Sequence, residues 1–462
     1  MPSVSADGRT YGFTIRPGYA FSPPSDAPVT ADVIRYSIER ALSPGLGSDA
    51  PGPAVVGDIV GESAFRAGTA AHISGLTAVG DRLKVTLTKP SPDFLERLAL
   101  PYFCPVPIDT PIVPGGVQDV APPSAGPYYM TLPRETGELM ILKRNPNYTG
   151  PRPHFFDAFA IREGIDPGEA VGRVEQGTWD AVSEVNKYVT NFPIVDDPSF
   201  APGGILEREF AGSSPSGPSY EATPLPWVDY LAFNASRPLF SRSRVRLAVA
   251  SVLDRSALAA TRTEAPSDQL LPPAMGGAQS LAPYRPSVSK LRGVTAPLGG
   301  AGRVAIMGVP ADCELCLQVA QDVTAQLRPI GIRVRIKMMK DVSTASLADA
   351  PVDLVERITT LPYPDGASFL AKMFTADVPA TWLPSLVRSK AVHRMTLTGP
   401  QRSIGASHLA DELARSEAPV AAFGYGTIGE LFSERLGCIE SQPFGTGINL
   451  AALCLDSDAR DP

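Results

Sequence analysis

The chain has 462 residues, which is too long for one compact core and predicts two or three domains. Its net charge of −7, with no long cluster of lysine and arginine, argues against a nucleic-acid partner. No stretch reaches the roughly 18 consecutive apolar residues of a membrane span. The 48 prolines predict long irregular connections between the elements of secondary structure.

The N-terminal region predicts two hairpins with a helix between them. Asp7-Gly8 is a strong hairpin turn sequence and leads into an alternating apolar strand. Thr30 is a good helix N-cap, and the helix that follows has a buried stripe made of Ile34, Ile38 and Leu42. A second hairpin arm at 79–82 feeds an alternating strand, and a short helix is expected around 94–98.

Residues 230–258 predict a strand, a turn and a helix. The short apolar strand 230–233 ends at Asn234, and Pro238 prevents the strand from continuing because it lacks a backbone N–H. The helix then has one apolar face at helical spacing, with Arg242, Arg244 and Arg246 mostly off that face. The apolar face consists of Val245, Ala248, Val249, Val252 and Leu253.

The region from residue 303 predicts a strand–helix–strand unit. The expected strand 303–309 is followed by a helix over 315–327, which Gly331 ends. Ile332, Val334 and Ile336 then alternate as in a second strand. Because a helical crossover joins parallel strands, this part of the chain should contain a parallel sheet.

No arrangement typical of an enzyme is visible. The four histidines are scattered, and nucleophile-elbow, zinc-protease and phosphate-loop motifs are missing from the sequence. Cys313 and Cys316 follow a strand and open a helix, which is the placement of a thiol-redox site. The alternative is that they cap and pack a surface helix, with or without a local disulfide. Five cysteines leave at least one unpaired in a monomer, and whether Cys438 and Cys454 pair is open.

Several segments in order resemble one protein family. They include the Ser-x-Asp-Gly strand with its Thr-Ala-x-Asp-Val-like helix, Gly126-Pro127-Tyr128, and the Arg144-Asn145-Pro146 run that ends at Gly150. The strand, turn and helix of 230–258 and the Ile330-Gly331-Ile332 turn add to them. Together these segments resemble the family 5 extracellular solute-binding proteins, the receptors of oligopeptide, dipeptide and nickel importers.

The resemblance implies an α/β, two-lobe periplasmic-binding-protein fold of type II, with an extra α/β subdomain in the first lobe. The first lobe would span 1–233 and the second 234–429, and 430–462 would be a tail returning to the first lobe. The family's opening strand and helix precede the segments matched here, and residues 1–8 do not look like a signal peptide. We therefore expect an N-terminal truncation.

The resemblance also suggests where ligand would bind, between two lobes that close over it. For three of the suggested residues a structural role is the alternative: Tyr102 and Phe103 line a pocket or fill the core, and Asn234 binds ligand or caps a turn. Residues 359–370, which include Thr360, Tyr363 and Asp365, resemble the family's second-lobe motif. Asp365 is expected to cap the helix that follows. Tyr425 and Trp382 are further candidates for pocket or core.

One departure from the family motif concerns charge. The family's first aspartate, which meets the α-ammonium of a bound peptide, is replaced by Pro362. Because a buried ammonium without a counter-charge costs several kcal/mol, recognition of a free peptide N-terminus is in question.

The function implied by the resemblance is a non-enzymatic, extracytoplasmic receptor of an ABC importer. It would be a monomer that binds a small molecule or peptide, needs no cofactor or metal, and delivers the solute to permease subunits. The alternatives are a sensor built on the same fold, a thiol-redox protein using Cys313 and Cys316, and a degenerate copy that binds nothing.

Overall fold

The structure is a computed structural model that describes most of the chain. The described residues are 2–47, 50, 52–114, 121–131, 139–183, 197–212, 217–275, 288–295, 304–442, 444 and 447–456. The chain forms two compact units. The first consists of Met1–Asp180, Glu434–Glu440 and Ile448–Pro462, and the second of Ala181–Ser433 and Ser441–Gly447.

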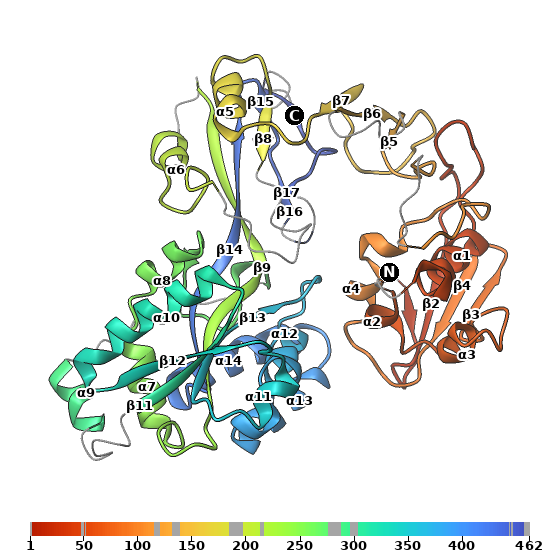
Figure 1. Cartoon of the computed structure of the whole chain (residues 1–462). Coiled ribbons are helices and arrows are strands. Elements are labelled where there is room, and N and C mark those ends of the chain that lie inside the picture. The colour runs from red at the N-terminus through yellow and green to blue at the C-terminus, as the bar shows by residue number, and fades with distance from the viewer. Residues whose placement is uncertain are drawn as a thin grey trace. The chain divides into compact units, whose positions relative to one another are not determined.

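The first unit contains a four-stranded antiparallel sheet of order β1-β2-β4-β3 (Figure 1). The strands are β1 (Ser3–Val4), β2 (Thr10–Thr14), β3 (Leu76–Val79) and β4 (Arg82–Thr86). Both predicted hairpin turns are confirmed. Helix α1 (Ala31–Ala41) packs on β3 and β4, and its N-cap is Thr30, as predicted. The shorter helices are α2 (Gly52–Val56), α3 (Glu62–Arg66) and α4 (Phe94–Leu98).

The rest of the first unit is a small sheet with one helix and short strands. The antiparallel strands β5 (Tyr128–Met130), β6 (Met140–Arg144) and β7 (Ala158–Ile161) lie in that order. Helix α5 (Pro167–Glu175) follows them, and near the end of the chain β15 (Leu436–Gly437) pairs with β18 (Cys454–Leu455).

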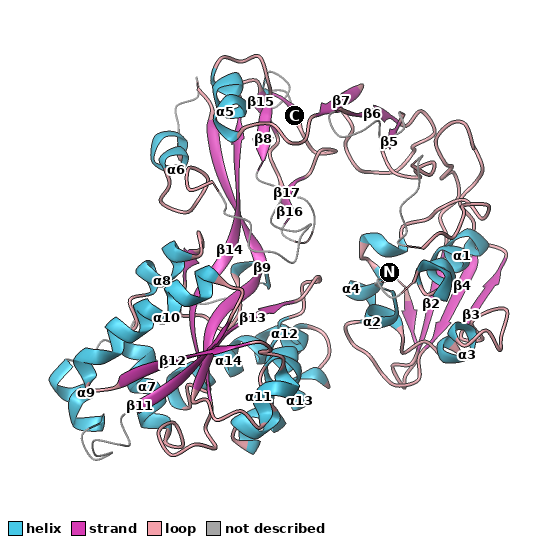
Figure 2. Ribbon diagram, viewed as in Figure 1, coloured by secondary structure: helices cyan, strands magenta, loops and turns pink. Residues whose placement is uncertain are grey.

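The second unit is built on a seven-stranded mixed sheet flanked by helices (Figure 2). Its order is β10-β14-β9-β13-β11-β12, and β8 pairs with β14. The strands are β8 (Ala181–Ser183), β9 (Ser219–Phe233), β10 (Ala265–Pro266), β11 (Val304–Pro310), β12 (Arg333–Met339), β13 (Leu354–Thr360) and β14 (Val420–Phe432). Strand β11 runs parallel to β12 and β13, which confirms the predicted crossover through α10 (Glu314–Leu327).

The helices of the second unit form its core with the sheet. Buried apolar residues of α7 (Ser243–Val252), α8 (Arg255–Thr261), α9 (Val288–Thr295) and α10 pack with residues of β9, β11, β13 and β14 in one cluster. The remaining helices are α6 (Ile205–Phe210), α11 (Thr344–Ala348), α12 (Gly366–Lys372), α13 (Ser385–Met395) and α14 (Pro400–Ser416). Among the described residues, no helix is long and apolar enough to cross a membrane.

Two local predictions are corrected. Strand β9 begins at Ser219, eleven residues before the predicted start at Tyr230, although Pro224 and Pro226 lie inside it. Its pairing with β14 is irregular beside these prolines, which is where a strand tolerates a missing N–H. The helical spacing predicts Arg246 mostly off the apolar face of α7, but the residue is only 1% exposed.

The buried Arg246 is satisfied by backbone groups. Its guanidinium donates to the carbonyl oxygens of Glu417, Ala418 and Phe240 at 2.7–3.2 Å and pairs with the carboxylate of Glu417. Burying a guanidinium requires such partners, so the hydrogen bonds explain how a charged residue can lie inside the helix packing.

Four cysteines form two disulfides, Cys313–Cys316 and Cys438–Cys454, and Cys104 is free. The structure thus answers the pairing question that the sequence left open. The lobe boundary predicted at Phe233 lies inside the second unit, which begins at Ala181 and contains the whole of β9. The compact units do not test where the ligand-binding lobes end, so those boundaries stay a prediction.

Candidate functional site

In the first unit, the two adjacent aromatic candidates differ in accessibility. They belong to the short 3-10 helix Pro101–Phe103, which packs on α1. Phe103 is buried, whereas Tyr102 is 48% exposed and contacts the Phe103 ring edge-on at 6.5 Å between centroids. Tyr102 is therefore the accessible residue of this pair, and Phe103 lies buried beside it.

Asn234 is buried at the end of β9, and its polar atoms are used within the second unit. The side-chain amide donates to the carbonyl oxygen of Val352 at 3.1 Å. Its carbonyl oxygen accepts from the backbone N–H and the hydroxyl of Ser236 at 3.1 and 2.5 Å. These are the contacts of a turn cap that also ties β9 to the start of β13.

Tyr363 and Asp365 lie inward, after the end of β13. Tyr363 is buried. Asp365 is the N-cap of α12 and accepts from the N–H of Ser368 at 2.6 Å. Its carboxylate also forms a two-point ion pair with Arg402 at 2.6 and 2.8 Å. The expected capping role of Asp365 is thus present, and Arg402 engages both of its oxygens.

Thr360 is exposed at the end of β13 and pairs across the sheet with Trp227 of β9. The indole N–H of Trp227 donates to the carboxylate of Glu264 at 3.0 Å. A Cβ on Gly426 would lie 2.1 Å from the indole ring, so only glycine leaves room for it. Trp227 is therefore a half-buried aromatic surface held in one position beside Thr360.

Sequence reasoning missed Trp227. Pro224 and Pro226 argue against a strand at this position, so the sequence did not predict one there. The available signal was the pair Gly424 and Gly426 on the partner strand, because glycines in a strand indicate a bulky neighbour. Adjacent strand residues point to opposite faces, so Tyr425, which pairs with Val228, lies on the other side of the sheet from Trp227.

The other aromatic candidates of the second unit are less accessible. Tyr425 is half-buried, and burial followed by the nearby Glu207 raises the pKa of its hydroxyl. Trp382 is completely buried and belongs to the core. Asn234 and Thr360 lie at opposite ends of β13, which over seven residues separates them by about 20 Å. The structure therefore does not bring all the candidates of this unit together.

A group of buried charges lies behind Trp227. It contains the carboxyl groups of Asp229 and Glu264, together with Glu356 and the guanidinium of Arg262, whose side chains are 5% and 11% exposed. Arg262 donates to one oxygen of Glu356 at 2.5 and 2.7 Å. Burial raises the pKa of Glu356 to about 7, against the opposing effect of Arg262.

Asp229 and Glu264 behave as a pair of neighbouring acids. Neither oxygen of Asp229 receives a hydrogen bond, and one oxygen of Glu264 is equally unpartnered. Burial first, and then the negative charge of Glu264, raises the pKa of Asp229 well above its usual range. The pKa of Glu264 is also raised, by burial, so the surroundings of this pair favour the protonated form.

A shallow depression of about 550 Å³ lies on the sheet of the first unit. Hydroxyl side chains of Thr10, Thr14 and Thr77 and the cations of Arg82 and Lys84 line part of it. None of the predicted binding residues does. Within the described ranges, no group of three or more histidine, cysteine or acidic side chains is arranged to hold a metal ion.

Comparison with known proteins identifies the chain. The sequence profile of bacterial extracellular solute-binding proteins, family 5 (middle), matches residues 2–379. No curated protein sequence matches significantly.

Solved structures share the fold. MppA, a periplasmic murein tripeptide binding protein in its unliganded open form, is 19% identical with a TM-score of 0.76, over 98% of this chain and 87% of its own. NikA from Brucella suis, in complex with Fe(III)-EDTA, is 20% identical with a TM-score of 0.69, over 99% and 90%. A nickel ABC transporter protein from Bacillus halodurans is 16% identical with a TM-score of 0.73, over 97% and 88%.

These similarities confirm the α/β, two-lobe fold of type II that the sequence predicted. The family match extends over most of the chain, and its members bind solutes outside the cytoplasm. The chain belongs to the bacterial extracellular solute-binding proteins of family 5 and is a substrate-binding receptor.

Proposed function

We propose that this receptor captures a small solute of the peptide or peptide-like class outside the cytoplasmic membrane and delivers it to the permease of an ATP-driven importer. It acts as a monomer and without catalysis. The observation that carries the proposal is the family match over residues 2–379. Similar solved structures include a murein tripeptide binding protein and a clavulanic acid biosynthesis oligopeptide binding protein, which supports the ligand class.

We assign ligand contacts to side chains that are both accessible and held in place. In the second unit these are Trp227 and Thr360, because Glu264 and Gly426 fix the indole beside the end of β13. In the first unit the assigned residue is Tyr102. An aromatic face offers a large apolar area with little loss of side-chain entropy, which suits peptide side chains of several kinds.

The segment after β13 also predicts which end group the ligand carries. Pro362 is exposed where a carboxylate would meet a ligand ammonium, and the one carboxylate of 360–366, Asp365, is engaged by Arg402. This segment therefore has no free negative charge to offer. We expect the ligand to present an uncharged or blocked end here.

A thermal-shift screen tests the ligand class. The receptor is heated with free peptides, the same peptides N-acetylated, sugars or nickel, each from micromolar to millimolar concentration. A ligand at 100 times its Kd stabilises the folded state by about 2.7 kcal/mol, which raises Tm by several degrees. Free peptides should raise Tm, and the N-acetylated peptides should raise it by at least as much. Stabilisation by sugars or nickel but not by peptides would overturn the assignment of a peptide ligand. If no compound raised Tm, the proposal that the receptor captures any of these solutes would be overturned.

The variant Pro362→Asp tests the end-group argument, with Pro364→Asp as the matched control because it is also exposed and lies two residues away. A hydrogen bond to a charged group contributes about 1.5 kcal/mol or more, which corresponds to about tenfold in affinity. Pro362→Asp should therefore favour free over acetylated peptides by about tenfold, measured by calorimetric titration. Equal ratios in both variants would show that the ligand end is bound elsewhere.

A further inference from the structure

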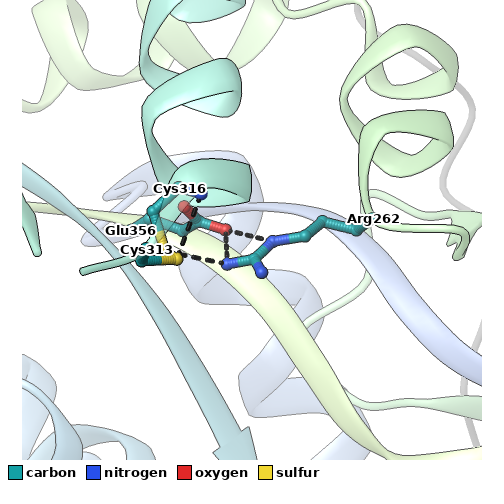
Figure 3. Close-up of a disulfide and its surroundings, with 4 residues drawn as sticks. All are labelled: Arg262, Cys313, Cys316 and Glu356. Carbon is teal, nitrogen blue, oxygen red and sulfur yellow. Dashed lines mark hydrogen bonds and ion pairs between the residues drawn. A yellow bond between two sulfur atoms is a disulfide. The ribbon is translucent and has the colours of Figure 1, made fainter. Parts of the chain in front are cut away.

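The disulfide Cys313–Cys316 lies at the N-terminus of the 14-residue helix α10 (Figure 3). Cys313 is the N-cap, and its sulphur accepts a hydrogen bond from the N–H of Cys316 at 3.1 Å. Cys313 is half-buried, whereas Cys316 is buried. An attacking thiol therefore reaches the sulphur of Cys313 more readily than that of Cys316.

A fixed cation lies beside the buried sulphur. The guanidinium of Arg262, at the end of α8, is 3.4 Å from Cys316 Sγ. The same guanidinium is held by the Glu356 carboxylate of β13, to which it donates twice (Figure 3). Because the side chain of Glu356 is only 5% exposed, moving Arg262 away would leave a buried carboxylate without its partner.

These surroundings favour a thiolate at Cys316. A neighbouring cation and a helix N-terminus each stabilise the negative charge of a cysteine sulphur and lower the pKa of the thiol. In disulfide exchange, the sulphur with the lower thiol pKa is the better leaving group. The accessible sulphur and the stabilised leaving sulphur are thus two different atoms, as efficient exchange requires.

We propose that Cys313–Cys316 is a thiol–disulfide exchange site of this receptor, at which an external dithiol attacks Cys313 and Cys316 leaves as a thiolate beside Arg262. This proposal goes beyond solute capture and does not depend on the ligand class.

The exchange is balanced by the dithiol. One thiolate of the dithiol forms a mixed disulfide with Cys313 Sγ, the Cys313–Cys316 bond breaks, and its electron pair stays on Cys316 Sγ. The second thiol loses its proton and attacks the dithiol's own sulphur in the mixed disulfide, which releases Cys313 as a thiolate. Two electrons pass from the dithiol to the cysteine pair, and the dithiol becomes a disulfide.

The second disulfide of the chain is an internal control. Cys438 is exposed, so the pair Cys438–Cys454 is no less accessible to a reductant. Among the described residues, no guanidinium or ammonium group is hydrogen-bonded to either of its sulphurs. A lower midpoint ratio for Cys313–Cys316 would therefore not come from greater exposure, and the variants described below separate the effect of Arg262 from that of loop length.

The experiment equilibrates the folded receptor, carrying Cys104→Ser to remove the free thiol, with mixtures of reduced and oxidised dithiothreitol at pH 7. After acid quenching, each cysteine is alkylated and quantified by mass spectrometry. Cys313–Cys316 should become half reduced at a reduced-to-oxidised ratio about tenfold lower than Cys438–Cys454, since a Cys316 thiol that is about nine-tenths ionised at pH 7 stabilises the reduced form about tenfold. Equal midpoints, or earlier reduction of Cys438–Cys454, would overturn the proposal without any variant.

A charge-neutral double variant tests the role of Arg262. Arg262→Gln with Glu356→Gln removes the cation together with its buried partner, so neither charge is left alone. The control is Arg255→Gln, because Arg255 lies on the same helix and donates to the backbone carbonyls of Ala422 and Ala250. The double variant should raise the midpoint ratio of Cys313–Cys316 about tenfold. A shift no larger than in the control would remove Arg262 from the mechanism.

Discussion

Replacing Glu430 by glutamine should make the receptor less sensitive to alkaline pH. Glu430 lies in β14 and is 1% exposed. Its carboxylate accepts from the hydroxyls of Ser183 and Thr223 at 3.0 and 3.1 Å, and no ion pair involves it in the part of the chain that the structure describes. Burial raises its pKa from the usual 4.5 to about 7.

The sign and size follow from proton linkage. Above pH 4.5 the unfolded chain has released this proton, whereas the folded protein keeps it until about pH 7. The stability that Glu430 contributes is therefore complete below pH 4.5 and is lost as pH rises through 7. Between pH 5 and 8 the loss from this one group is about 2.5 kcal/mol.

Urea unfolding at pH 5 and pH 8 measures this loss. Glutamine keeps one acceptor oxygen, and its amide can donate to a neighbouring hydroxyl, so the packing of Glu430→Gln should be preserved. From pH 5 to pH 8 the wild type should lose about 2.5 kcal/mol more of its free energy of unfolding than the variant does. Glu434→Gln, at an exposed glutamate, should follow the wild type. Identical pH dependence in Glu430→Gln and wild type would refute a proton held at Glu430.

Three further substitutions test the buried interactions. Arg246→Ala should lower the free energy of unfolding in urea by about 3 to 5 kcal/mol, because it removes a buried cation from several partners. Arg244→Ala, at an exposed arginine, is the control and should change it by less than about 0.5 kcal/mol. Gly426→Ala should displace the Trp227 ring, cost about 1 to 3 kcal/mol and shift tryptophan fluorescence; unchanged fluorescence would contradict the close contact. Asp229→Asn should raise stability at pH 8 and leave it unchanged at pH 4, and a loss at both would contradict the raised pKa.

The parts of the fold that follow from local chemistry could be predicted from the sequence. Asp7-Gly8 acts through its own backbone geometry, and the hydroxyl of Thr30 accepts from the N–H of Val33, three residues later, so the turn and the cap do not depend on distant residues. The parallel pairing of β11 with β12 follows from the short crossover helix between them.

The partners of buried polar groups could not be predicted, because they come from distant parts of the chain. Asn234 bonds to Val352, 118 residues later, and Arg402 holds Asp365 across 37 residues. The sequence shows that Asp365 can cap a helix, but it does not show that Arg402 also pairs with the Asp365 carboxylate. Tyr102 and Phe103 make the same point, since neighbouring aromatic residues of similar hydrophobicity are exposed and buried respectively.

Arg262 joins the candidate binding surface to the disulfide. Trp227 is fixed by Glu264, whose carboxyl is influenced by the charge of Arg262, and Arg262 also contacts Glu356 and Cys316. A thiolate formed at Cys316 would offset part of the positive charge that now opposes protonation of these acids. Reduction should therefore raise the pKa of the buried carboxyl groups and steepen the loss of stability with rising pH, so the redox state and the proton state of this unit are coupled through one guanidinium.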